Sequence, residues 1–339
     1  MSHLKLIAAG AAVVGGTASL AMSGVSLALG RRFINEFTRP GMAVEMDSPN
    51  WGGWKFPDSV AEPTQAMQRV VGFQSADGTS LRGEFWAQPH PAPTIIISHG
   101  FHLPCVNFRS VAALEYSYGA NIFIFDYRGH GDSAQVPTTC GNAEVNDLLA
   151  AVQFVAQQAE TLPGKVYIHG FSMGAAVAIL MPPQAAVAGI IADSPYAGLD
   201  DMILMIIAQI FHQETTHFRG PARIFRKLIP LLTHITFNSG RLQFLMRYRR
   251  PLIAHPDRAI LRQSAVLGNT LGHLPPPILL IHAEGDPLIS LHHAHRLVLA
   301  AQKVGRSIQE YYTPSIVHCG SYGHDPQRYM TVLRAFLAA

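Results

Sequence analysis

From residue 69 onward, short apolar runs alternate with longer segments whose apolar residues recur at helical spacing. Runs such as Thr94–Ser98 and Asn121–Asp126 are rich in β-branched and aromatic residues, which is typical of strands buried on both faces. The pair Asp77-Gly78 lies between the first two runs and favours a β-hairpin there. The pattern therefore predicts strands of two kinds, a hairpin followed by buried strands that alternate with helices.

The expected elements can be read off in order. The strands are Arg69–Phe73, Leu81–Ala87, Thr94–Ser98, Asn121–Asp126, Lys165–His169, Val187–Ala192, Ile278–His282 and Gln309–Tyr312. The helices are Arg109–Tyr118, Asn142–Gln158, Gly174–Met181, His292–Lys303 and Pro326–Leu337. This alternation predicts an α/β protein with a mostly parallel sheet flanked by helices.

The N-terminal segment is apolar throughout. From Leu6 to Gly30 there is no charged residue, and this length exceeds the about 20 residues that cross a bilayer. It also exceeds the apolar region of a cleavable signal peptide, which has about 7–15 residues. Residues 1–32 are therefore predicted to form a single-pass transmembrane helix that anchors the protein in a membrane. Export after signal cleavage is the first alternative, and a buried or peripheral helix is the second, because Gly and Ala make the segment only moderately hydrophobic. Its orientation stays open, because Lys5 opposes Arg31 and Arg32 across the segment.

Residues 200–265 interrupt the alternation of strands and helices. Residues 211–250 hold eight Lys and Arg residues against Glu214 alone, among many Phe, Leu and Ile residues. This composition predicts a helical cap inserted between two parts of the α/β core, residues 68–199 and 266–339, with residues 33–67 as a proline-containing linker. Two interpretations of the cap stay open: a solvated basic face, or an amphipathic surface that touches anionic lipid headgroups or a lipid-like substrate.

Composition narrows the classes of function. Hydrophobic residues make up 48% of the 339 residues and charged residues 14%, while the net charge is only +3, which is too small to indicate a nucleic-acid partner. Three cysteines, Cys105, Cys140 and Cys319, do not form a disulfide framework. His292, His293 and His295 do not share one face of a helix, so no metal site is expected there.

The most informative motif is Gly170-Phe171-Ser172-Met173-Gly174. It follows the expected strand Lys165–His169 and precedes a helix of small residues. A Gly-x-Ser-x-Gly turn in this context is typical of a nucleophile elbow, in which glycines relieve the crowding around a strained serine. The helix that begins there favours negative charge developing near the serine. Ser172 is therefore the candidate nucleophile.

A serine hydroxyl needs a histidine as base and a carboxylate to orient that histidine. Asp286 follows the expected strand Ile278–His282, and His318 follows the last expected strand. Both therefore lie at the carboxyl ends of strands, where open parallel sheets build their sites. The alternatives left open are Glu284 and Asp193 for the acid and His324 for the base.

Taken together, these segments resemble the α/β-hydrolase family of serine hydrolases. The matching segments are Ser98–Phe101, Asp126–Ser133, Gly170–Gly174, Ala192–Pro195, His282–Asp286 and the region of His318. The resemblance implies Ser172, Asp286 and His318 as the catalytic triad and the backbone N–H groups of Met173 and Phe101 as the oxyanion hole. It implies structural roles for His99, Asp126 and the Arg128–Gly131 turn. Bacterial membrane-anchored esterase-like members have a similar layout.

The expected activity is cleavage of a carboxylic ester or related acyl compound through an acyl-serine intermediate, without cofactor or metal. A serine at the elbow argues against dehalogenase and epoxide hydrolase chemistry, which use an aspartate nucleophile on a similar fold. Peptidase, thioesterase and acyltransferase activities use the same triad and stay open, as does a non-catalytic relative that only binds. The expected partners are a small-molecule or lipid-like acyl substrate and a membrane. The substrate and the oligomeric state are left open.

Overall fold

The computed structural model describes residues 27–35, 37–39, 62–183, 185–214, 216, 224–267 and 275–338. The chain divides into two compact units. The helical unit comprises Met1–Phe37 and Ile203–Leu252, and the sheet unit comprises Thr38–Met202 and Ile253–Ala339. Each unit is described here by itself.

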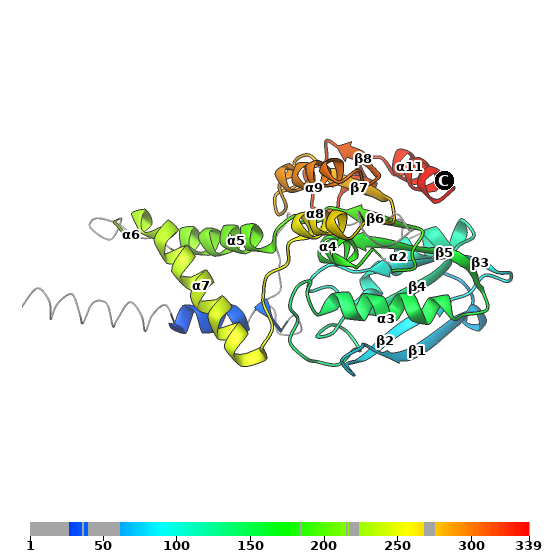
Figure 1. The fold of residues 1–339 in the computed structure, drawn as a ribbon, viewed down its shortest axis with the longest axis horizontal. Helices are drawn as coiled ribbons and strands as arrows, with labels where there is room; N and C mark the ends of the chain where they lie inside the picture. The colour runs from blue at the N-terminus through cyan, green and yellow to red at the C-terminus, as the bar shows by residue number, and fades with distance from the viewer. Residues whose placement is uncertain are drawn as a thin grey trace, which may run out of the picture. The chain divides into compact units, whose positions relative to one another are not determined.

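The sheet unit is built on a sheet of eight strands in the order β1-β2-β4-β3-β5-β6-β7-β8 (Figure 1). The strands are β1 (Gln68–Gln74), β2 (Ser80–Trp86), β3 (Ala92–Ser98), β4 (Asn121–Asp126), β5 (Thr161–Phe171), β6 (Gly189–Asp193), β7 (Ile278–Ala283) and β8 (Ile308–Thr313). β1 and β2 form the predicted hairpin, and β2 pairs antiparallel with β4. The remaining pairs are parallel, which confirms the mostly parallel sheet and brings the carboxyl ends of six strands to one edge.

Helices cover both faces of this sheet, as predicted. They are α2 (Arg109–Ser117), α3 (Glu144–Ala156), α4 (Met173–Leu180), α8 (Pro256–Leu267), α9 (Leu291–Lys303), α10 (Ser321–His324) and α11 (Pro326–Ala338), with 3-10 turns η2 (Gln65–Met67) and η3 (Cys105–Phe108). Successive strand residues point to opposite faces. Ile122 and Ile124 of β4 pack in the cluster that includes residues of α2 and α11, whereas Phe123 meets Phe154 of α3 with ring centroids 5.0 Å apart.

One strand is longer than its pattern indicated. β5 begins at Thr161, where Thr161 pairs with Ala92, and the register shifts before Thr94 pairs with Val166. The intervening Gly164 has φ +71°, so the strand bends at a residue that favours this conformation. The sequence predicted a strand only over Lys165–His169, because the preceding pair Pro163-Gly164 normally indicates a turn.

The helical unit contains α6 (Ile224–Lys227), α7 (Ile229–Tyr248), most of α5 (Leu199–Glu214) and a helical segment at residues 27–35. This segment meets α7 at a pair of glycines: a Cβ on Gly30 would lie 2.8 Å from the backbone nitrogen of Gly240. The Gln243 side-chain amide donates to the carbonyl oxygen of Leu27 at 3.0 Å. Small residues at this crossing therefore let the two backbones approach closely.

The membrane prediction falls mainly on residues 1–26, and much of the predicted linker on residues 40–61; both ranges lie outside the described residues. Within the described ranges, none of the helices combines the length and the apolar character that a bilayer crossing requires. The boundaries of the cap stay a prediction. α8 lies inside the range expected for the cap, and it belongs to the sheet unit, where it packs against α4 and α9.

Candidate active site

The predicted strand–turn–helix around the candidate nucleophile is present. Ser172 lies between β5 and α4 with φ +52° and ψ −112°, a backbone conformation that L-residues rarely adopt. Its N–H donates to the carbonyl oxygen of Asp193 at 2.8 Å. A Cβ on Gly174 would lie 2.0 Å from the Ser98 carbonyl oxygen, and a Cβ on Gly170 would lie 2.6 Å from Ala175. The turn therefore requires glycine at both flanks.

The candidate base and acid are hydrogen-bonded to each other. His318 Nδ1 lies 2.7 Å from Asp286 Oδ2, and both side chains are buried. The other carboxylate oxygen accepts the N–H groups of Leu288 and Ile289, each at 2.9 Å. Burial opposes ionisation of Asp286, but the hydrogen bond and charge of His318 and the Ile289 N–H outweigh it, so the pKa of Asp286 lies below its ordinary value. An ionised Asp286 accepts a hydrogen bond from Nδ1–H of a neutral His318, which leaves Nε2 with its lone pair.

The backbone that carries His318 meets the elbow at one carbonyl group. The oxygen of Asp193 accepts the Ser172 N–H at 2.8 Å and lies 3.9 Å from the thiol sulfur of Cys319. The same thiol lies 3.7 Å from His318 Nε2 and interacts with the backbone of Ser172. Segments 146 residues apart in sequence are thus joined at the carboxyl end of β6.

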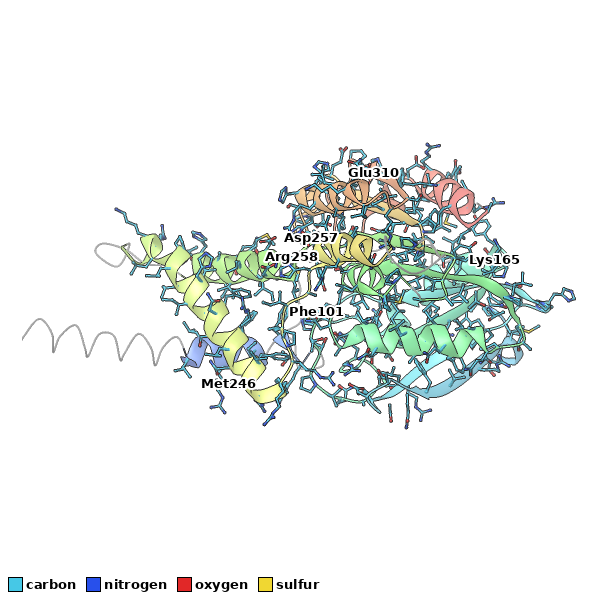
Figure 2. The ribbon with its side chains drawn as sticks, in the orientation of Figure 1. Phe101, Lys165, Met246, Asp257, Arg258 and Glu310 are labelled. Atoms are coloured by element: carbon cyan, nitrogen blue, oxygen red, sulfur yellow. The ribbon has the colours of Figure 1, made fainter. Side chains whose placement is uncertain are left out.

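The loop after β3 runs beside the elbow. A Cβ on Gly100 would lie 3.6 Å from the Cβ of Ser172 and 3.7 Å from the Phe171 oxygen, so this glycine stands directly against the candidate nucleophile. Phe101, the next residue, is half-buried and labelled in Figure 2. Met173 is buried at the first turn of α4. The assignment of the Phe101 and Met173 N–H groups as an oxyanion hole stays a prediction.

The alternatives for acid and base lie in different surroundings. Glu284 is exposed, and His324 is exposed on α10. Asp193 is fully buried and accepts hydrogen bonds from Ser194 Oγ at 2.9 Å and from the Tyr329 hydroxyl at 3.0 Å. Of the candidates named from the sequence, Asp286 and His318 are the acid and base that a hydrogen bond joins.

The residues expected to be structural hold the loops around the site. The ring of His99 accepts the Tyr127 N–H at 2.9 Å through Nε2 and therefore donates from Nδ1 to the Gly100 oxygen at 2.7 Å. Burial lowers the pKa of His99 to about 4, so the ring is neutral. Asp126 accepts the N–H groups of Cys105 at 2.6 Å and Asp132 at 3.0 Å.

A buried polar chain behind the site was not predicted from the sequence. His169 of β5 contacts Glu115 of α2 at 2.5 Å through Nδ1 and the Tyr329 hydroxyl at 3.0 Å through Nε2. The carboxylate of Asp193 accepts hydrogen bonds from the hydroxyl groups of Tyr329 on α11 and of Ser194. The Ser194 hydroxyl also accepts the Cys319 N–H at 3.3 Å. Burial raises the pKa of Asp193 to about 6, against the opposing effects of His169, Ser194 and Tyr329. The chain therefore ends at the residue next to the candidate base.

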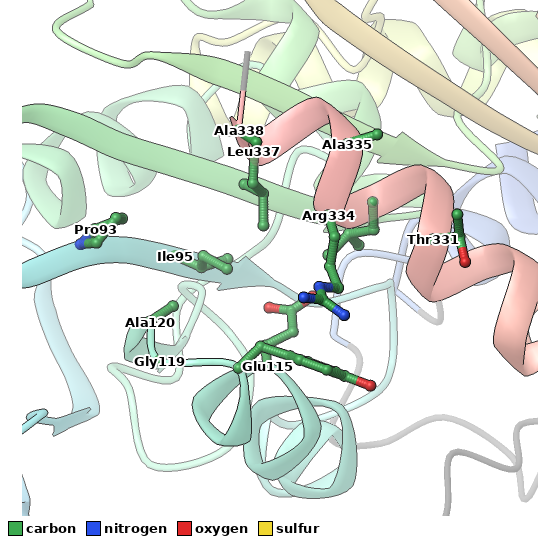
Figure 3. Close-up of a pocket in the computed structure, with 12 residues that line it drawn as sticks. Pro93, Ile95, Glu115, Gly119, Ala120, Thr331, Arg334, Ala335, Leu337 and Ala338 are labelled. Atoms are coloured by element: carbon green, nitrogen blue, oxygen red, sulfur yellow. The ribbon is translucent and has the colours of Figure 1, made fainter.

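The opposite end of this chain lies at a pocket of about 500 Å³ (Figure 3). Ile95 of β3, Glu115 and Tyr118 contribute to its lining together with Leu333 and Arg334 of α11. These residues lie toward the beginning of β3 and β4, whereas Asp286 and His318 follow the ends of their strands. This pocket is thus separate from the candidate active site.

The described residues hold no cluster of three His, Cys, Asp or Glu side chains suited to a metal ion. His293 of α9 is buried and its Nδ1 accepts the N–H of Ala197 at 3.2 Å. Burial lowers the pKa of His293 to about 4, with the Arg296 charge acting in the same direction. This histidine fixes the loop after β6 to α9.

Known proteins resemble this chain in sequence and in structure. Residues 95–331 match the sequence model of the alpha/beta hydrolase family. The Bacillus subtilis protein YqkD, an uncharacterized protein, is 27% identical over 283 residues, which is 82% of each chain. The Pyrococcus furiosus esterase Pf2001 has a TM-score of 0.60 at 21% identity, covering 83% of this chain and 96% of its own. Prolyl oligopeptidase B from Galerina marginata has a TM-score of 0.50 at 15% identity, with 80% of this chain and 36% of its own covered.

Proposed function

This chain belongs to the alpha/beta hydrolase family, and we propose that it is a serine hydrolase that cleaves carboxylic esters or related acyl compounds through an acyl-serine intermediate. The observation that carries the proposal is the hydrogen bond between Asp286 and His318, in a segment that meets the strained elbow of Ser172 at the Asp193 carbonyl. A buried acid–histidine pair beside a serine in this conformation has the parts that acyl transfer needs.

In the proposed reaction, Ser172 attacks the carbonyl carbon of the substrate while His318 Nε2 takes the hydroxyl proton. Asp286 accepts the hydrogen bond from Nδ1–H and stabilises the imidazolium that forms. The N–H groups of Met173 and Phe101 donate to the oxyanion, and the loss of one such donor typically lowers turnover about 100- to 1000-fold. His318 then gives its proton to the leaving alcohol, and water repeats the steps on the acyl group.

The names of two solved structures that share this fold suggest which substrates to test first. A likeness to the Pyrococcus furiosus esterase makes esters the first substrates to test. The likeness to prolyl oligopeptidase B keeps peptide bonds as the second class. A screen of p-nitrophenyl esters of increasing acyl length, thioesters and peptide amides separates the esterase, thioesterase and peptidase activities.

The test of the nucleophile is a fluorophosphonate probe. We expect covalent labelling of the wild type at Ser172 and none of Ser172→Ala, together with loss of hydrolysis. Ser194→Ala is the matched control, because Ser194 also has a positive φ, of 54°, at the end of a strand of the same sheet. Folded wild-type protein that resists the probe would favour the non-catalytic binding alternative.

For localisation, we propose that the uncharged segment Leu6–Gly30 attaches the protein to a membrane. Deletion of residues 1–26 is the suitable variant, because the helical segment 27–35 packs against α7 and must be kept. The full chain should remain with membranes under alkaline carbonate extraction, while the shortened chain should be released. A mature chain found by mass spectrometry to begin after this segment would support the export alternative.

A further inference from the structure

α7 carries apolar side chains on two opposite faces. Its inward face is buried in the helical unit and consists of Ile229, Thr233, Thr236, Phe237, Gly240 and Phe244. On the opposite side, Leu231, Leu242, Leu245 and Met246 have exposed fractions of 51%, 57%, 48% and 64%, and we name these four residues the outer stripe. Leu242 follows Leu231 by eleven residues, about three turns at 3.6 residues per turn, so the outer stripe lies along one line of the helix.

The outer stripe differs from the exposed apolar residues of the sheet unit. Those residues, such as Val70 of β1, Leu299 of α9 and Ile316, lie on different elements and are ordinary for a soluble surface. The outer stripe places four large apolar side chains on one side of a single helix, with the exposed residues His234 and Asn238 between Leu231 and the other three. Met246 projects from α7 in Figure 2. A helix that is apolar on both faces normally has a partner on each.

Basic residues flank the outer stripe. Arg241, Arg247 and Arg249 are exposed at the carboxyl-terminal half of α7 and at its cap, and Arg31 is exposed on the segment that packs against α7. Between residues 203 and 252 the sequence holds eight Lys and Arg residues and the single acid Glu214. Long basic side chains beside apolar ones can place their alkyl stems on the apolar surface while their charges reach phosphate groups.

The positive charge beside the outer stripe favours an anionic bilayer over a second copy of the chain as its partner. A second copy of the chain, packed about a two-fold axis, would bring the same arginines together and would repel itself. An anionic bilayer offers apolar acyl chains to the leucines and phosphates to the arginines. The uncharged sequence Leu6–Gly30 also runs into the helical segment that contacts α7, and Leu27 within it is 56% exposed.

We propose that the outer stripe of α7 lies in the interface of an anionic membrane, with its four apolar side chains among the acyl chains and the flanking arginines at the phosphates. This inference rests on the proposed membrane attachment and not on the assignment of the nucleophile. The helical unit would then hold the protein along the bilayer surface, in addition to the N-terminal segment.

The test uses the full chain in vesicles of phosphatidylcholine and phosphatidylglycerol. Leu242→Cys is labelled with bimane and compared with Leu299→Cys, whose parent side chain is equally exposed, at 55% against 57%. The three native cysteines are buried and stay unlabelled under native conditions. Brominated lipids should quench the bimane at position 242 several-fold more strongly than at position 299. Equal quenching at the two positions would overturn the proposal.

Two further arms identify the partner. Quenching at position 242 should fall in vesicles of phosphatidylcholine alone. It should also fall with Arg241→Gln, because the loss of one arginine charge lowers partitioning to the anionic membrane about fivefold. Arg262→Gln on α8 is the matched control and should leave the quenching unchanged. A bimane signal that is shielded without lipid and rises with protein concentration would overturn the proposal in favour of a second copy. Fluorophosphonate labelling of Ser172 on the same samples reports separately on the proposed activity.

Discussion

Two buried carboxylates follow neighbouring parallel strands, and their surroundings push them in opposite directions. Asp193 ends β6, and Asp286 follows β7, the next strand in the sheet. Asp286 accepts two backbone N–H groups and the His318 ring, and its pKa is lowered. Asp193 accepts two hydroxyl groups, and burial raises its pKa to about 6. Burial alone therefore does not determine the direction in which a carboxyl pKa shifts; here backbone donors and a histidine partner reverse its effect.

The largest expected effect is on ester hydrolysis, which substitution of Asp286 should lower far more than substitution of Asp193. Asp286→Asn should lower kcat/KM for esters about 10⁴-fold, because an amide donates to Nδ1 and leaves His318 with its proton on Nε2, the wrong tautomer. Asp193→Asn should cost at most about tenfold, since this side chain only supports the segment of Cys319 through Ser194. Esterase assays on both purified variants decide, and the reverse order of losses would make Asp193 the acid.

The second effect is on stability against pH, and the two residues should show opposite signs. The folded pKa of Asp193 is raised from its ordinary 3.8 to about 6, so the stability that its protonated form contributes is lost as pH rises from about 3.8 to about 6. Asp193→Asn removes this term, and its free energy of unfolding relative to wild type should rise by about 3 kcal/mol between acid and neutral pH. The folded pKa of Asp286 is lowered, so the stability it contributes is present above the unfolded value and is lost as pH falls.

Urea unfolding of both variants at acid and neutral pH measures this difference. Asp286→Asn should lose stability relative to wild type as pH rises, and Asp193→Asn should gain it. Parallel pH slopes for the two variants would show that the two carboxylates share one kind of environment. The comparison needs no substrate, so it stands apart from the proposed activity.

A smaller effect is expected from the hydroxyl that supports Asp193. Tyr329→Phe removes the donor to Asp193 and the contact to His169, and should lower the free energy of unfolding by about 1–3 kcal/mol. Its kcat should fall far less than that of Asp286→Asn. Tyr322→Phe on the adjacent helix α10 is a control of the same size change. Equal losses of stability in the two variants would remove the special role of Tyr329.

The smallest effect concerns Ser194, which links Asp193 to the backbone of Cys319. Ser194→Ala removes its donation to the carboxylate at 2.9 Å and its acceptance of the Cys319 N–H at 3.3 Å. We expect a loss of about 0.5–1.5 kcal/mol in unfolding free energy and a modest change in kcat. A loss of activity as large as that of Asp286→Asn would mean that the Cys319 segment, rather than Asp286, fixes His318.

Much of the sheet was predictable because its signals are local. The buried strand Asn121–Asp126 has the same bounds in the pattern and in the structure, and the Asp77-Gly78 turn gave the hairpin. The elbow was predictable because the motif and its flanking strand and helix are consecutive in sequence, although the atom that requires glycine at position 174 is the distant carbonyl oxygen of Ser98 on β3. The start of β5 was missed because Pro163 and Gly164 imitate a turn.

The polar chain behind the site could not be predicted from the sequence, because its members lie far apart along the chain. His169 meets residues 54 and 160 positions away, on two different helices. An isolated histidine in an apolar strand is the one signal it left. The sequence already favours Asp286 over Glu284, although both follow the same strand; the structure adds that Glu284 is exposed and that Asp286 accepts the N–H of Ile289. The outer stripe could not be identified from the sequence, because α7 has apolar residues on both faces and only the exposed fractions show which of them face away from the helical unit.

The position of the Cys319 thiol beside His318 bears on how the protein should react with alkylating reagents. Its sulfur lies 3.7 Å from Nε2 of His318, the candidate base, and burial raises the pKa of the thiol well above the ordinary value. Sulfur held in this neutral form is a poor nucleophile. Iodoacetamide should therefore spare hydrolysis in the folded protein, although a potential cysteine nucleophile lies beside the imidazole.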